Sequence, residues 1–341
     1  MARRAGLRDL ADAAGVSLAT VDRALNGRER VRPETLAHIA EVARSIGHPA
    51  ALRLDGRAAD LPMVRLGVAL HKQGQDFYKA FAEELHRTLA TLQGVRPRLV
   101  LEFSSSQSPG EMAGLLRSMA GRCDVLAATA VNHPEVTAAV ATLREAGLPV
   151  FSLLSDFAQE LRTGYLGLDN LKHGRTAAWM MSLVAREPGK VAIFVGGHRW
   201  HGHELRETGF RAYLREHASH LVALDAMVNL ETRALTYEAT LALLDRHADL
   251  RGVYVAGGGM EGAIAALREA KRPDVALIVP AMTGEVRAGL AEGLVTMALD
   301  TPLEKLCRTL FAMMIRAAQS RGAEAPTQVF LPPDIHFRES I

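Results

Sequence analysis

The chain has few cysteines and no long apolar run. Its two cysteines, Cys123 and Cys307, are too few for a disulfide framework, and two buried free thiols in a cytoplasmic protein are the simplest interpretation. No run approaches the roughly 18 apolar residues of a membrane-spanning helix, so we expect no membrane partner. The N-terminus is basic but lacks a long apolar stretch, and it does not resemble a signal peptide.

A strong excess of one charge is also missing, since the formal net charge is +2 over 341 residues. Residues 1–60 hold ten arginines, no lysine and eight acidic residues, so the whole excess lies there. A local basic face attracts a phosphate backbone, although this excess is small. The length exceeds one ordinary core, and 48% hydrophobic with 23% charged residues is typical of a globular protein.

Residues 7–26 (LRDLADAAGVSLATVDRALN) have the pattern of two short helices joined by a glycine turn. Gly15 permits a tight turn because it lacks a Cβ, and Ser17 can cap the second helix. A third helix is predicted to begin at Pro33 and to end near Gly47. These patterns predict an all-α helix-turn-helix headpiece.

The outward side chains of the second helix are candidates for reading DNA, because that helix enters the major groove in such motifs. Arg23 can donate two hydrogen bonds to guanine, and Asp22 can accept one from cytosine. Leu18 and Ala19 can contact thymine methyl groups. An ordinary three-helix unit with a solvated polar face is the alternative. The candidate residues in this region are Ser17, Leu18, Ala19, Thr20, Asp22, Arg23, Asn26, Arg28 and Arg30.

From residue 64 onward, short apolar runs alternate with helical stretches. This alternation predicts parallel, doubly wound α/β sheets covered by helices, in two lobes. The apolar runs lie at 64–70, 97–103, 124–130, 148–154, 190–196, 252–256, 275–280 and 295–299. The expected boundaries are 1–48 for the headpiece, 49–63 for a hinge or linker, and 64–341 for an effector-binding core, with an N-lobe at about 64–167 and 300–325 and a C-lobe at about 168–299 and 326–341.

Ligands of parallel sheets bind beyond the carboxyl ends of the strands, which points to the segments after each apolar run. Phe77 and Tyr78 can stack on an apolar sugar face, or can pack under the following helix. Asn132, Ser155 and Asp156 follow the next two runs. The pair Asp169-Asn170 can contact a ligand or cap a helix.

Two further motifs suggest other chemistry. His198, His201 and His203 with Glu204 invite a metal interpretation, but their spacing fits no familiar zinc motif, so we expect no metal. Residues 257–262 satisfy Gly-x-Gly-x-x-Gly after a predicted strand, yet the next strand ends without the acid that would hold a ribose. With no nucleophile elbow or Walker loop either, we expect no cofactor and no enzyme.

The string Val-Ser-Leu-Ala-Thr-Val-Asp-Arg-Ala-Leu-Asn at 16–26 resembles the headpiece of the lac-repressor (LacI/GalR) family of bacterial regulators. That family shows Val-Ser-x-x-Thr-Val-Ser-Arg-x-Leu-Asn, and a branch of it carries Asp where this chain has Asp22. The ending FRESI is similar to the family's as well. The resemblance implies a two-lobed periplasmic-binding-protein-like core and, without a leucine-heptad tail, a homodimer.

The resemblance also implies site residues. Arg206 matches an arginine of the family pattern, while Glu204 stands where the family has a ligand-gripping arginine. The family wedges a linker leucine into the minor groove, and Leu54 is the preferred candidate here although its register is shifted. With the residues above, the candidate effector-binding set is Phe77, Tyr78, Asn132, Ser155, Asp156, Trp200, Glu204, Arg206, Gly257 and Asp300.

The sequence therefore predicts a cytoplasmic, sequence-specific transcriptional regulator. We expect a homodimeric repressor that binds double-stranded operator DNA under the control of a small-molecule effector bound between the lobes. A sugar, polyol or sugar derivative is favoured by the resemblance, and a more apolar or cationic effector stays open. An enzyme on a Rossmann-like core and a solute-binding transport component are the competing hypotheses.

Overall fold

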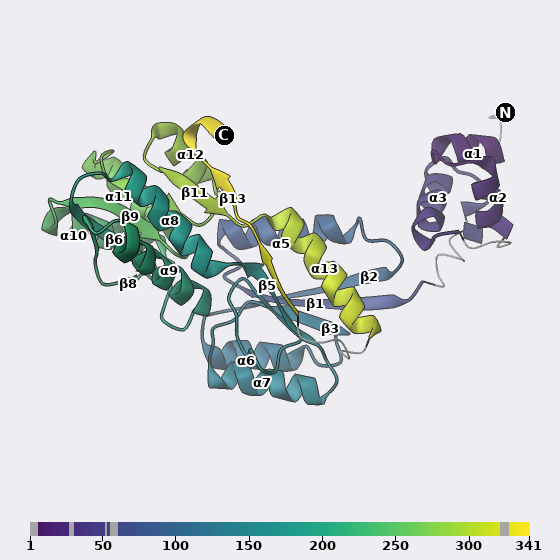
Figure 1. The fold of residues 1–341 in the computed structure, drawn as a ribbon. Coiled ribbons are helices and arrows are strands. Elements are labelled where there is room, and N and C mark those ends of the chain that lie inside the picture. Colours follow the sequence, from purple (N-terminus) through teal and green to yellow (C-terminus); the bar gives the residue numbers. More distant parts are fainter. Residues whose placement is uncertain (1–5, 27–30, 52, 55–60, 321–326) are drawn as a thin grey trace. The chain divides into compact units, whose positions relative to one another are not determined.

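The N-terminal part of the molecule is a three-helix headpiece. The computed structural model describes residues 6–26, 31–51, 53–54, 61–320 and 327–341. The helices are α1 (Leu7–Ala13), α2 (Leu18–Asn26) and α3 (Pro33–Ser45) (Figure 1). Gly15, with a φ of 63°, makes the turn between α1 and α2. The Ser17 hydroxyl accepts the backbone N–H of Thr20 at 3.1 Å and caps α2, so the predicted helix-turn-helix is confirmed.

The buried cluster of the headpiece reaches beyond residue 48, where the sequence led us to place the boundary. Leu10 and Val21 are fully buried in this cluster, and Leu54 is fully buried in it as well. Nδ1 of His48 accepts the N–H of Ala50 at 3.1 Å, and the N–H of Leu54 donates to the carbonyl of Ala50 at 3.0 Å. A helical turn thus adds the first part of the predicted linker to the headpiece.

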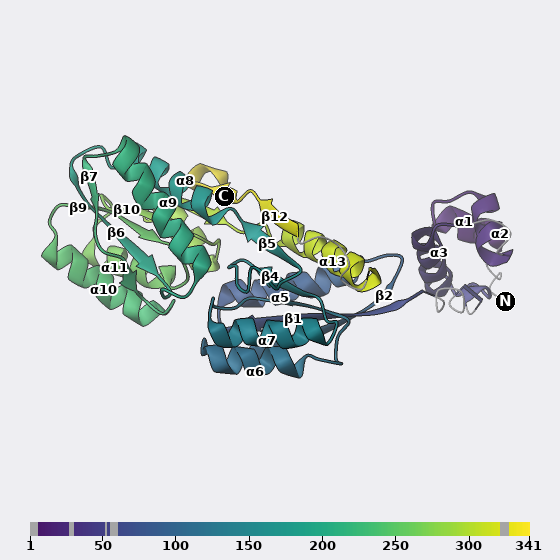
Figure 2. The same ribbon diagram turned by 60° about the horizontal axis from the view of Figure 1, so that its bottom comes forward.

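The first lobe of the core is a six-stranded sheet with the strand order β12-β5-β4-β3-β1-β2. Helices α6 and α7 cover one of its faces, and α5 and α13 cover the other (Figure 2). The strands are β1 (Met63–His71), β2 (Arg96–Ser104), β3 (Val125–Ala128), β4 (Val150–Leu153), β5 (Gly164–Leu168) and β12 (Thr327–Leu331). The helices are α5 (Asp76–Leu89), α6 (Pro109–Ser118), α7 (Pro134–Glu145) and α13 (Leu303–Gln319).

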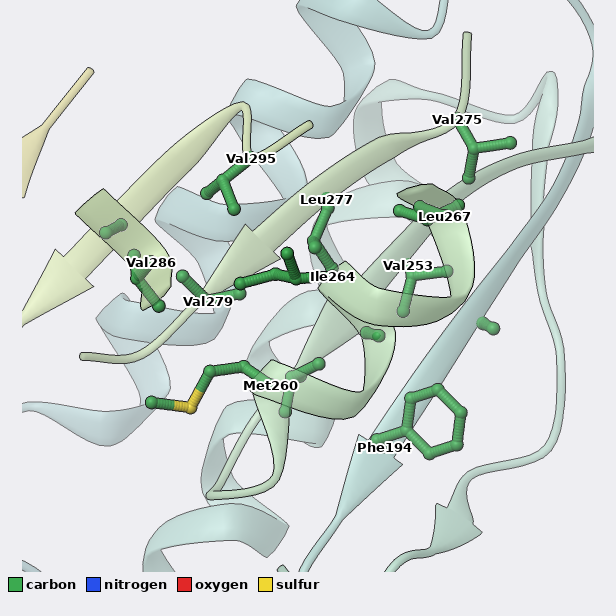
Figure 3. Close-up of a cluster of buried hydrophobic side chains, with 14 of the residues drawn as sticks. Phe194, Val253, Met260, Ile264, Leu267, Val275, Leu277, Val279, Val286 and Val295 are labelled. Atoms are coloured by element: carbon green, nitrogen blue, oxygen red, sulfur yellow. The ribbon is translucent and has the colours of Figure 1, made fainter. Parts of the chain in front are cut away.

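The second lobe is a sheet with the order β13-β11-β10-β9-β6-β7, and β8 pairs with β6. Apolar side chains of α10, α11 and α12 fill the core on one face (Figure 3), and those of α8 and α9 fill the other. The strands are β6 (Gly189–Val195), β7 (Leu221–Ala223), β8 (Met227–Val228), β9 (Leu250–Val255), β10 (Ala276–Val279), β11 (Met297–Asp300) and β13 (Asp334–His336). The helices are α8 (Asn170–Val184), α9 (His201–His217), α10 (Arg233–Arg246), α11 (Met260–Ala270), α12 (Gly284–Glu292) and the 3₁₀ turn η1 (Arg338–Ser340).

The chain passes between the two lobes three times, from β5 to α8, from β11 to α13 and from β12 to β13. The sequence predicts the last passage at residue 326. The parallel pairing of β12 with β5, in which Val329 lies opposite Leu166, places it at residues 332–333 instead. Two mainly parallel sheets covered by helices on both faces confirm the expected two-lobed α/β class.

Candidate functional site

The outward face of α2 carries the side chains predicted to read DNA. Leu18 is 42% exposed, and Ala19, Asp22 and Arg23 are exposed beside it. The amide of Asn26 donates to the Asp22 carboxylate at 2.7 Å, and Arg23 Nε donates to the Ala19 carbonyl at 3.2 Å. These contacts lie along one side of the helix, so the four predicted side chains share one accessible surface.

Three other predicted DNA-binding residues are placed differently. Arg28 and Arg30 lie outside the described residues. Leu54 is buried in the headpiece cluster, so a minor-groove role requires it to leave that cluster first. Its role stays a prediction.

A cavity of about 330 Å³ is lined by both lobes, and we call it the interlobe cavity. The first lobe contributes residues directly after β1, β3 and β4, and the second contributes residues after β6, β9, β10 and β11. These segments follow the carboxyl ends of the strands, where parallel sheets bind ligands. Of the ten predicted effector-binding residues, those that line the cavity are Phe77, Tyr78, Ser155, Trp200, Arg206 and Gly257.

One wall of the interlobe cavity is aromatic. The His71 ring lies 4.5 Å from the Tyr78 ring and 4.7 Å from the Trp200 ring, measured between centroids. His71 Nε2 and the Tyr78 hydroxyl are hydrogen bonded at 2.7 Å, while His71 Nδ1 is buried with no partner among the described residues. Burial lowers the pKa of His71 to about 3, so its ring is neutral near pH 7.

Arg206 on α9 brings a buried guanidinium to the cavity. Its Nε donates to the side-chain oxygen of Asn170 at 2.7 Å, and its Nη1 donates to the carbonyl of Ala256 at 2.8 Å. Close packing of α8 and α9 makes this possible, because a Cβ at Gly174 would lie 1.9 Å from the Arg206 carbonyl oxygen. Burial lowers the pKa of Arg206, an effect opposed by nearby Tyr254, Tyr165 and Glu231.

A buried carboxylate, Glu231, also lines the cavity and was not predicted. It lies in the loop between β8 and α10, forms an ion pair with Lys72 and accepts the N–H of Gly258 at 2.9 Å. His203 Nε2 is 3.7 Å from its Oε1. Burial alone would raise the pKa of Glu231, but His203, Lys72 and His71 outweigh burial and lower that pKa to about 2. Burial lowers the pKa of His203 to about 4.

Four of the predicted effector-binding residues lie outside the cavity lining. Asp156 is buried in an ion pair with Arg162, whose Nε and Nη2 donate to it at 2.6 and 2.7 Å. Asp300 accepts the N–H of Thr301 at 2.9 Å, and burial raises its pKa. Glu204 is exposed, and so is Asn132, whose backbone N–H donates to the Arg199 carbonyl at 2.9 Å. Their ligand roles stay predictions.

Asp169 and Asn170 have different roles in the structure. The Asp169 carboxylate caps α8 by accepting the N–H of Lys172 at 3.1 Å, while Asn170 lines the cavity and orients Arg206.

The glycines at 257–259 leave room for other side chains of the second lobe, because they have no side chain of their own. A Cβ at Gly257 would lie 2.5 Å from Cε1 of His203, and one at Gly258 would lie 3.0 Å from Cβ of Glu231. Gly259 has a φ of 89° at the start of α11. The run that satisfies Gly-x-Gly-x-x-Gly therefore lies against an internal carboxylate.

The histidines after β6 separate in the structure. His203 lies in the interlobe cavity, His198 is exposed, and His201 is 3.5 Å from the exposed Glu204. Within the described ranges, no group of three or more His, Cys, Asp or Glu side chains is arranged to hold a metal ion.

Residues 66–323 match the family model described as periplasmic binding protein domain. The chain belongs to this family. Residues 6–49 match the model described as bacterial regulatory proteins, lacI family, so a lacI-type helix-turn-helix precedes the periplasmic-binding-protein-like core. None of the helices in the part of the chain that the structure describes is long and apolar enough to cross a membrane.

Two curated relatives are named as helix-turn-helix (HTH) type transcriptional regulators. The HTH-type transcriptional regulator reg1 of Streptomyces lividans is 28% identical over 215 residues, which cover 62% of this chain and 59% of that protein. An uncharacterized HTH-type transcriptional regulator from the aml 5' region of Streptomyces limosus is 25% identical, with 62% and 58% covered. This periplasmic-binding-protein family member thus spans about three-fifths of the length of the curated relatives it matches.

Solved structures of low identity share the fold. A solute-binding protein from Actinobacillus succinogenes with bound D-allose has a TM-score of 0.73 at 17% identity, covering 81% of this chain and 98% of that one. A solute-binding protein from Bacillus halodurans with bound myo-inositol has a TM-score of 0.72 at 16% identity, covering 82% and 96%. At this identity, the likeness shows the two-lobed fold and no more.

Proposed function

We propose that this protein is a homodimeric transcriptional repressor in the cytoplasm that binds operator DNA through α2 and a small-molecule effector in the interlobe cavity. The observation that carries the proposal is the presence in one chain of an exposed helix-turn-helix face and an interlobe cavity. The first supplies sequence reading, and the second supplies a ligand-dependent arrangement of the lobes.

The DNA contacts follow from the chemistry of the exposed face. The Arg23 guanidinium fits the O6 and N7 atoms of guanine, and the Asp22 carboxylate fits the N4 amino group of cytosine. Leu18 offers an apolar contact for a thymine methyl group. Two copies related by a two-fold axis would read the half-sites of a pseudo-palindrome.

For the effector we propose a sugar or polyol. The cavity offers an aromatic wall for the apolar face of such a ring, and Arg206 brings a guanidinium for its hydroxyls. His71 Nδ1 is buried and has no hydrogen-bond partner among the described residues, so it gains one from a hydroxylated ligand. The bound D-allose and myo-inositol of the structural neighbours support the same class.

The experiment is a fluorescence-anisotropy titration of the full chain with DNA selected from a random library. A selected pseudo-palindrome bound at least about 1000-fold more tightly than scrambled DNA supports the proposal. Arg23→Ala should remove preference at one base position per half-site and cost about 1–3 kcal/mol, while Arg8→Ala, exposed on α1, serves as the control for base preference.

Binding to all duplexes alike would contradict sequence-specific recognition. Sugars and polyols that raise the melting temperature are then added to the bound complex. Release of the DNA identifies an inducer and tighter binding a co-repressor, whereas no change with any stabilising ligand contradicts effector control.

A further inference from the structure

The loop that carries Glu231 has an unusual backbone. Leu230 and Glu231 are consecutive non-glycine residues with φ values of 50° and 56°, and Lys72, the partner of Glu231, has a φ of 56°. Side-chain-bearing residues rarely adopt this left-handed region, and where they do the surroundings must hold them there. The Asn229 side chain does so, since its oxygen accepts the N–H of Glu231 at 2.8 Å.

Three glycines form a slot for the Glu231 side chain within the second lobe. A Cβ at Gly196 would lie 2.5 Å from Glu231 Cγ, one at Gly257 would lie 3.0 Å from its Oε1, and one at Gly258 would lie 3.0 Å from its Cβ. The N–H of Gly258 donates to the carboxylate inside this slot. The second lobe therefore encloses part of the carboxylate and restricts its direction.

The first lobe supplies the partners of this loop. Lys72, directly after β1, forms the ion pair with Glu231, and both side chains are nearly buried, with 12% and 9% exposed. Gln75 Nε2 donates to the Glu231 carbonyl at 2.9 Å, and Gln107 Nε2 donates to the Leu230 carbonyl at 3.4 Å. Each of these contacts joins one lobe to the other.

We propose that Lys72 and Glu231 form an internal latch that holds the two lobes closed without help from an effector. A buried ion pair usually adds little stability, because both ions lose their hydration when they meet. Here the glycine slot, the Gly258 N–H and the Asn229 contact already hold the Glu231 carboxylate in place within the second lobe, so little side-chain freedom is lost when Lys72 binds it. Lys72 then adds a charge-assisted hydrogen bond from the first lobe to this fixed carboxylate.

This inference rests on the proposed function only for its consequence. If the lobe arrangement controls the headpieces, the latch sets how much of the population is closed before any effector binds, and an effector acts on that starting point. The latch itself is a property of the core, and its test needs neither DNA nor effector.

The test measures the distance between the lobes by spin labels at Ser118→Cys on α6 and Glu238→Cys on α10. Both positions are exposed, and the native Cys123 and Cys307 are buried, so the labels attach selectively. We expect a single narrow distance distribution in the labelled parent. Lys72→Met should raise the ratio of open to closed molecules at least about tenfold, and Lys72→Arg should restore most of the closed population.

Lys190→Met is the matched control, because Lys190 pairs with Asp249 at 3.3 Å entirely within the second lobe. Circular dichroism checks that each variant is folded. The latch is refuted if Lys72→Met has the parent's distance distribution, or if Lys190→Met opens the lobes as much. Failure of DNA binding in the earlier titration would leave this measurement unaffected, so the two proposals fail separately.

Discussion

Leu54 lies in the predicted linker but is fully buried in the headpiece cluster, and its truncation separates two roles for this side chain. Leu54→Ala removes a buried isobutyl group, and such substitutions cost about 2–5 kcal/mol. Because Leu54 lies at the edge of the described headpiece, where neighbours can relax, we expect the lower part of that range, about 2–3 kcal/mol. That cost corresponds to about a 30- to 150-fold shift in the unfolding equilibrium of the headpiece.

Amide hydrogen exchange measures this shift segment by segment in the free protein. Leu54→Ala should speed the exchange of buried α2 amides by about 30- to 150-fold and leave β9 and β10 unchanged. Leu18→Ala is the control, since Leu18 is 42% exposed on the same headpiece. If Leu54→Ala weakened operator binding but left α2 exchange at the parent rate, Leu54 would act only on DNA, and its assignment to the headpiece core would be refuted.

Three further predictions concern the core. Arg206→Ala should abolish the rise in melting temperature caused by a bound sugar or polyol. Arg215→Ala, a substitution at an exposed position of the same helix, should keep that rise. An equal rise in both variants would place the ligand elsewhere. Gly174→Ala should cost about 1–3 kcal/mol by separating α8 from α9, and an unchanged thermal midpoint would disprove that contact. Acid should destabilise the core, because the pKa values of His71 and His203 are lowered to about 3 and about 4. Below pH 6.5 the unfolded chain therefore binds more protons than the folded protein does. Each histidine should cost roughly 1–2 kcal/mol between pH 7 and pH 5, and thermal unfolding that is independent of pH in that window would contradict their burial as neutral rings.

Most strands of the two sheets could be predicted because they are continuous apolar runs. All eight predicted runs overlap a strand, from β1 to β11. β5 was missed because its sequence, Gly-Tyr-Leu-Gly-Leu, is interrupted by glycines. Its Gly164 is required by a tertiary contact, since a Cβ there would lie 2.8 Å from the Thr327 carbonyl oxygen of β12, and no local pattern reports such a contact.

The candidate site could be predicted only where position along a strand determines it. Tyr78, Ser155 and Arg206 follow strand ends or match a family position, and they line the cavity. Asp156 also follows a strand end, but Arg162 captures its carboxylate, and the partner of an acid cannot be deduced from spacing. Glu231 was missed because its backbone conformation, which aims it at Lys72, has no signature in residue type.

The place of β12 in the first sheet has a consequence for synthesis of the chain. β12 covers the outer edge of β5, yet residues 327–331 are translated after every other strand of this sheet. Until then, the backbone N–H and carbonyl groups along that edge of β5 have no strand beside them, which makes the nascent chain prone to pair with another copy. A protein truncated before β12 should therefore accumulate in inclusion bodies even though every residue that lines its interlobe cavity has been made.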